Sequence, residues 1–106
     1  MLRFVDALTE LDSRLSVGLN FTNYSERVGD ARVAYDRIPF KQLEYRCVHN
    51  VGVPAEDALN LYVQAYTIWN HCVGDIYCSN DSITRKLQRK WAEATRKLNH
   101  VQNALE

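Results

Sequence analysis

Apolar residues recur at alternating spacings of three and four along four segments of the chain, a pattern that places their side chains on one face of a helix. The first segment shows it in Met1, Phe4, Leu8, Leu11 and Leu15. No segment alternates with the period of two that a strand needs, so no sheet is expected. The pattern predicts helices over residues 2–20, 24–50, 55–77 and 82–105.

Turn and cap residues suggest where these helices begin and end. Asn23, three residues before Glu26, has the form of a capping box at the start of the second helix. Pro39 lacks an amide proton and disfavours a helical residue before it, so we expect a kink or a short break at Ile38–Pro39. The segment 50–54 combines a helix-stopping Gly with a Pro suited to a first helical turn, and we place the turn between the second and third helices there.

Four helices of similar length joined by short turns favour an all-α fold with one domain over residues 1–106. We expect an up-down-up-down four-helix bundle, made of two antiparallel helical hairpins, with the second helix kinked at Pro39. Trp69 and Trp91 lie equally far from the turn at Asn80, so we expect them in one buried layer, where truncation of either costs about 3 to 5 kcal/mol. An aromatic-lined ligand pocket between helices is the alternative.

Composition narrows the class of protein. The 106 residues are 46% apolar and 25% charged, which is typical of a folded globular chain and not of a disordered one. Thirteen basic residues balance thirteen acidic ones, so the strong basic excess of a dedicated nucleic-acid binder is missing. No apolar run reaches the roughly 20 residues that span a bilayer. Acids appear early in the first segment, so we expect no targeting signal.

The three cysteines leave two interpretations open. Cys47 lies in a helix seam, and we expect it to be unpaired. If the third helix ends near Gly74, Cys72 and Cys78 come within disulfide range; if it continues through Tyr77, about 9 Å of helical rise separates them. Reduced thiols favour a cytoplasmic protein, whereas an oxidised pair indicates a secreted or cell-envelope domain.

Metal and catalytic chemistry find little support in the sequence. The cysteines and histidines at positions 47, 49, 71, 72 and 78 do not form the compact pairs that zinc sites use. The histidines are scattered, no nucleophile has a neighbouring His and acid, and no Gly-rich phosphate loop is present. We therefore expect no enzyme activity, no metal and no cofactor.

Charge is balanced overall but is divided along the chain. Residues 83–106 hold six basic residues against two acidic ones, a net charge of +4, and residues 1–82 hold the compensating −4. The basic residues avoid the Leu/Trp seam of the last helix, so they should point outward as a basic stripe. The stripe is Arg85, Lys86, Arg89, Lys90, Arg96 and Lys97.

These patterns predict a small non-enzymatic helical module that binds another protein with an acidic face through the basic stripe. A solvated face without a partner is the simpler interpretation of the same charges. The alternatives are a ligand-binding bundle, secreted or from the cell envelope, and an accessory protein that contacts nucleic acid through the stripe. We rank nucleic acid below protein as the partner, because the chain as a whole is neutral. The sequence indicates neither the oligomeric state nor the partner.

Overall fold

The computed structural model describes residues 1–106 and is all-helical, with about 85% of the residues in helices and no strand. The expected fold class is therefore confirmed at the level of an all-α domain. Its elements are α1 (Leu2–Val17), α2 (Phe21–Asp36), the short 3-10 helix η1 (Phe40–Gln42), α3 (Tyr45–Cys47), the π-helical turn η2 (Val48–Gly52), α4 (Val53–Val73) and α5 (Asn80–Leu105).

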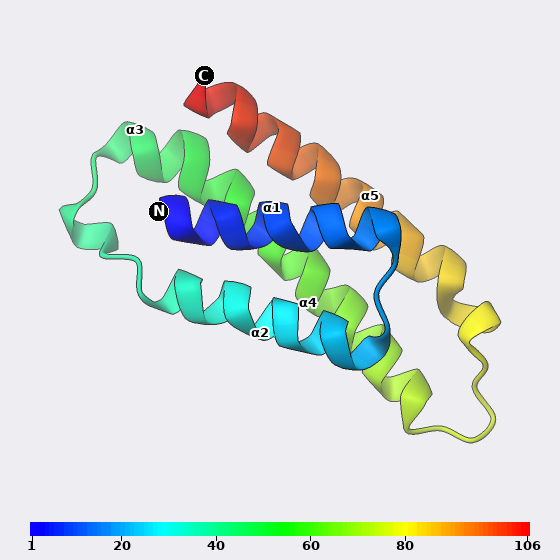
Figure 1. The fold of residues 1–106 in the computed structure, drawn as a ribbon. Coiled ribbons are helices and arrows are strands. Elements are labelled where there is room, and N and C mark those ends of the chain that lie inside the picture. The colour runs from blue at the N-terminus through cyan, green and yellow to red at the C-terminus, as the bar shows by residue number, and fades with distance from the viewer.

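The four long helices pack into one elongated body of 48 × 23 × 19 Å. Helix α1 packs along α2, and α4 packs along α5. Figure 1 shows the first pair, in blue and cyan, lying across the second pair, in green and orange. The loop between α4 and α5 extends beyond the ends of α1 and α2 and forms one tip of the molecule.

The core consists of apolar side chains that every long helix contributes, and no buried residue is charged or polar. Helix α1 buries Phe4, Leu8 and Leu11, as its repeat predicts. Helix α5 buries a row at the expected spacing: Ile83, Leu87, Ala94, Leu98 and Val101. Burial of such a row stabilises a helix far more than its intrinsic propensity does, which is why these two helices follow the pattern closely.

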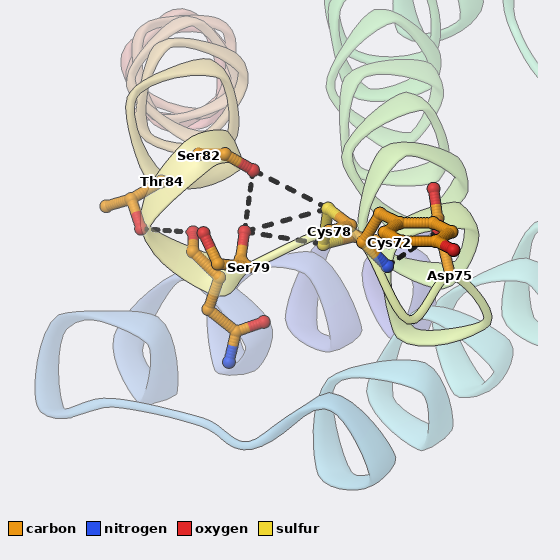
Figure 2. Close-up of a disulfide and its surroundings, with 8 residues drawn as sticks. Cys72, Asp75, Cys78, Ser79, Ser82 and Thr84 are labelled. Atoms are coloured by element: carbon orange, nitrogen blue, oxygen red, sulfur yellow. Dashed lines mark hydrogen bonds between the residues drawn. A yellow bond between two sulfur atoms is a disulfide. The ribbon is translucent and has the colours of Figure 1, made fainter.

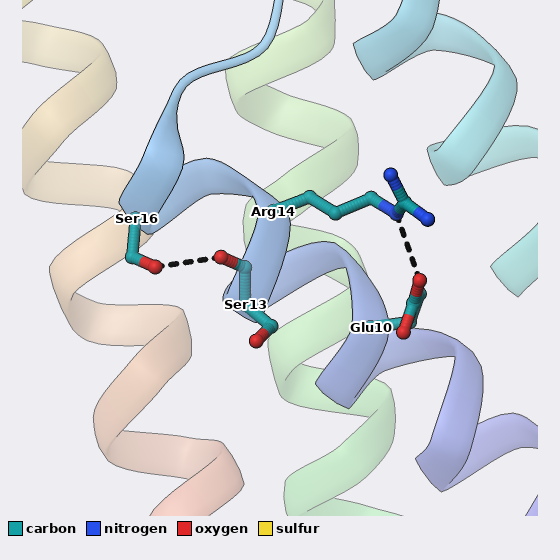
Figure 3. Close-up of polar contacts among 4 residues, drawn as sticks. All are labelled: Glu10, Ser13, Arg14 and Ser16. Atoms are coloured by element: carbon teal, nitrogen blue, oxygen red, sulfur yellow. Dashed lines mark hydrogen bonds and ion pairs between the residues drawn. The ribbon is translucent and has the colours of Figure 1, made fainter.

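Helix α1 ends at Val17, three residues earlier than expected, because Gly18 adopts a φ of 118° that only glycine accommodates readily. Figure 3 shows its last turns, where Arg14 Nε donates to Glu10 Oε1 at 2.8 Å and the Ser16 hydroxyl donates to the Ser13 carbonyl. Both contacts are exposed, and an exposed ion pair of this kind contributes only a few tenths of a kcal/mol.

Helix α2 differs from its prediction at both ends. It begins at Phe21, because the side chain of Asn20, and not that of Asn23, caps it by accepting the Asn23 amide at 2.8 Å. It ends at Asp36, so the interruption expected near Ile38–Pro39 is present as a break in the helix, and the kinked continuous helix is not confirmed. Pro39 lies instead in the connection that leads to α3, directly before the turn of η1.

The turn expected at residues 50–54 is wrong, since the chain stays helical from Tyr45 to Val73. The Val53 amide donates to the Val48 carbonyl, a wide π-type bond that shifts the hydrogen-bond pattern just before Pro54. Proline costs least where a regular bond is already displaced. Gly52 has ordinary helical dihedral angles and is buried beside Met1 and Phe40. The reversal between the second and third predicted helices therefore lies at residues 37–44.

The helices are not matched in length, because α1 and α2 have 16 residues each, α4 has 21 and α5 has 26. Helix α4 ends at Val73, four residues before its predicted end at residue 77, and Ile76 is 90% exposed in the following loop. Helix α5 begins at Asn80, two residues before its predicted start.

Candidate functional site

The basic stripe lies on the outward face of α5. One helical row contains residues 85, 89, 93, 96 and 100, and the neighbouring row contains residues 86, 90, 93 and 97. Five of the six basic side chains are exposed, and Lys90 is half-buried against α4. Helix α5 therefore brings all six predicted residues to one surface, over an axial length of about 18 Å.

Few acids neutralise this stripe. Arg96 lies 3.8 Å from Glu93 on the same helix, and Lys97 lies 3.8 Å from Asp57 of α4. Lys90 Nζ donates to the neutral Gln64 amide oxygen at 2.8 Å. Arg85, Lys86, Arg89 and Lys90 have no carboxylate within the 4.0 Å of an ion pair. The first two turns of the stripe thus carry uncompensated positive charge.

The part of α4 beside the stripe adds little charge of its own. Ile68 is half-buried and lines a shallow hollow together with Lys86, Arg89, Lys90 and Glu93. Residues 48–83 contain no Lys or Arg, so α4 brings no further cation to this surface. Asp57 is its acidic contact with the stripe. The stripe is therefore a charged helix face edged by a largely neutral helix.

A second candidate, the aromatic cluster between α2, α4 and α5, is a packed part of the core. The Trp69 and Trp91 rings lie 5.9 Å apart, which confirms that the two tryptophans share one level. Each is half-buried and packs against the buried core, so the buried layer expected for them is only partly formed. Tyr24 lies between them, 5.5 Å from each ring, and is itself fully buried. The main surface hollows are lined by other residues, so the tryptophans line no ligand pocket among them.

A hydrogen-bond network ties this cluster to α1. Trp91 Nε1 donates to the Tyr24 hydroxyl at 3.0 Å, and that hydroxyl donates to the Tyr62 carbonyl at 2.7 Å. The Tyr62 hydroxyl points to Asp12 of α1 at 3.5 Å, and the Thr95 hydroxyl donates to the same carboxylate oxygen. The sequence pattern did not indicate Asp12 and Thr95, because each flanks an apolar seam where an exposed residue is the ordinary expectation.

Burial raises the pKa of the Tyr24 phenol far above its ordinary range, although the hydrogen bond from Trp91 opposes the shift. Burial also raises the pKa of the Tyr62 phenol, and the negative charge of Asp12 raises it further. Both groups lie inside the packed core, because each residue is fully buried.

These shifts predict how the fold responds to alkali. Because the folded-state pKa of both phenols lies above the unfolded value near 10, their contribution to stability is full below about pH 10 and falls as the pH rises further. We expect Tyr24 and Tyr62 to ionise only as the helices unfold, measured by phenolate absorbance and circular dichroism together. Ionisation of all six tyrosines in a chain that keeps its helical spectrum would contradict this.

Cys72 and Cys78 form a disulfide with a Cα–Cα distance of 5.2 Å. Of the two alternatives left open by the sequence, the structure has the one in which the helix ends near Gly74 and the two cysteines come within bonding range. Cys47 is free, as expected, although the reason differs. It lies on the same continuous helix as Cys72, roughly 35 Å away along the axis, and not on a separate helix before a turn at residues 50–54. This separation places Cys47 and His49 out of reach of the other cysteines, and no three metal-ligating side chains gather anywhere in the chain.

None of the helices combines the length and hydropathy that crossing a bilayer requires. Comparison of the chain with protein-family models, with curated proteins and with solved structures finds no match.

Proposed function

We propose that this chain is a small, non-enzymatic helical module that binds an acidic protein surface through the basic stripe of α5. The observation that carries the proposal is the run of Arg85, Lys86, Arg89 and Lys90, four cations without an acidic partner on one exposed helix face. Like charges on one helix repel one another, so this arrangement is destabilising unless an opposite charge from outside relieves it.

The division of charge along the chain supports the same proposal. The compensating acids lie on residues 1–82, and only Asp57 among them pairs with the stripe. We also propose that α4 and α5 form the second hairpin of an up-down-up-down arrangement, with the stripe on its outer side. Arginine is enriched in protein interfaces, and the three arginines of the stripe are all exposed.

The absence of enzyme activity is part of the proposal, and the placement of the perturbed groups supports it. Catalytic acids and bases depend on a shifted pKa in a site that a substrate can enter. The phenols with the largest shifts, Tyr24 and Tyr62, are fully buried and are engaged by side chains of their own chain. These two phenols are therefore structural groups of the core and not catalytic groups.

Charge reversal tests the proposed interface. The triple variant Arg89→Glu, Lys90→Glu and Arg96→Glu replaces attraction with repulsion toward an acidic partner, and we expect its affinity to fall at least about 30-fold. The matched control, Arg32→Glu, Lys41→Glu and Arg46→Glu, changes the net charge equally at exposed sites outside the stripe and should bind as the parent does. Affinity capture with quantitative mass spectrometry compares the three chains.

Two results would overturn the proposal. One is retention of the same proteins by the triple variant and by the parent chain. The other is a bound fraction that nuclease treatment removes, which would identify nucleic acid as the partner. Binding should also weaken between about 0.1 M and 1 M salt, because the Debye length falls from about 10 Å to 3 Å.

A further inference from the structure

The loop that joins α4 to α5 is short and internally braced. The Cys72–Cys78 disulfide closes it, and Figure 2 shows the bond beside the first turn of α5. The Asp75 carboxylate accepts the Tyr77 amide at 2.9 Å, and the Cys78 amide donates to the Asp75 carbonyl at 3.1 Å. The crosslink and these bonds limit the conformations open to the loop, so the side chains at its turn are presented in a defined arrangement.

Two large side chains at this turn lie almost entirely in solvent. Ile76 is 90% exposed and Tyr77 is 91% exposed, and the neighbouring Val73 is 56% exposed. Full burial of an isoleucine side chain stabilises a protein by about 1.5 to 3 kcal/mol, and the exposed Ile76 makes no such contribution to the fold. The loop also lies at one tip of the molecule, beyond the ends of α1 and α2 (Figure 1).

Positive charge follows this apolar tip along α5. Helix α5 begins at Asn80, and Arg85 and Lys86 follow within about 9 Å of helical rise, with Arg89 and Lys90 one turn beyond. Asp75 and Asp81 are the acids of the same region, and the Asp75 carboxylate is occupied by a backbone amide. The four cations outnumber the two acids, so residues 73–90 have a positive net charge of two.

We propose that this tip docks onto an anionic lipid bilayer. Ile76 inserts into the boundary between headgroups and acyl chains, Tyr77 lies at the headgroup level that aromatic rings with a polar end prefer, and the first turns of α5 face the lipid phosphates. A pair of side chains on a protruding turn suits a deformable surface better than a flat rigid one. Each cation near an anionic surface adds about 1 kcal/mol, so charge and insertion together give reversible peripheral binding.

Vesicle flotation tests this inference without any protein partner. The probe is phosphatidylcholine mixed with phosphatidylglycerol at about 2:1, with phosphatidylcholine alone for comparison. We expect the oxidised chain to float with the anionic vesicles, and the double variant Ile76→Ser and Tyr77→Ser to lower its partition coefficient about tenfold or more. The control Leu2→Ser and Val33→Ser, which removes two exposed apolar side chains from the α1–α2 end, should stay within about twofold.

Each contrary outcome is decisive. Failure of the oxidised parent chain to bind anionic vesicles above the level for phosphatidylcholine overturns the inference, and so does binding that the tip variant leaves unchanged. Equal helical circular dichroism of the variants shows that folding is not the cause. The tip variant keeps the whole basic stripe, so loss of vesicle binding with intact protein capture separates this inference from the proposed function.

Discussion

Replacement of Tyr24 by alanine should lower the free energy of unfolding by about 3 to 5 kcal/mol. Its ring is fully buried and contacts both tryptophans at 5.5 Å, so truncation leaves a cavity where α2, α4 and α5 meet. It also removes the hydroxyl that accepts from Trp91 and donates to the Tyr62 carbonyl. Chemical denaturation followed by circular dichroism measures the change.

The variant Tyr24→Phe separates the ring from the hydroxyl. It keeps the packing but leaves the Trp91 indole N–H without its acceptor, and we expect a loss of about 1 kcal/mol. A loss below about 1 kcal/mol for the alanine variant would mean that the three rings do not pack as described, because cavities of this kind cost several times more.

Replacement of Phe4 by alanine should lower the free energy of unfolding by a similar amount, about 3 to 5 kcal/mol. Phe4 is 1% exposed and meets the Tyr35 ring edge-on at 5.3 Å, which joins α1 to the end of α2. Leu2 offers a matched control on the same helix, since it is 63% exposed and its replacement by alanine should change stability by no more than about 0.5 kcal/mol. Equal losses for the two variants in the same denaturation experiment would show that α1 does not pack through this face.

The sequence predicted best the helices whose apolar spacing is regular and whose opposite face is strongly polar. In α5 Leu87, Ala94, Leu98 and Val101 are buried at helical spacing, and the six cations are on the outside. The same argument placed Phe4, Leu8 and Leu11 of α1 in the core. Such helices have one orientation that buries apolar area without burying charge, so spacing alone determines it.

Turn-forming residues gave a wrong helix boundary where tertiary packing kept the helix continuous. Gly52 and Pro54 resemble a helix boundary, yet burial of Val51 and Gly52 against the N-terminus and the 37–44 connection keeps the helix continuous through a π turn. Propensity at one or two residues is worth about 1 to 3 kcal/mol, which packing of a long helix can outweigh. Because that boundary was misplaced, Cys47 was assigned to the second predicted helix, whereas it lies on the helical stretch that continues to Val73.

The end of α4 could not be predicted because the apolar spacing continues past it. Ile76 follows Trp69 and Cys72 at helical intervals, but the chain leaves the helix at Gly74 and turns back to close the disulfide. The contacts of Lys90 with Gln64 and of Lys97 with Asp57 likewise depend on the register between α4 and α5. Spacing within one segment carries no information about that register.

Lysine footprinting of the complex tests the central proposal most directly. The chain has four lysines, of which Lys86, Lys90 and Lys97 lie in the basic stripe and Lys41 lies in η1. Amine modification, read by mass spectrometry, is compared for the free chain and for the chain bound to the protein that it captures. We predict protection of the three stripe lysines with Lys41 still reactive. Protection of Lys41 alone, or equal reactivity of all four lysines in the free and bound chain, would contradict recognition through α5.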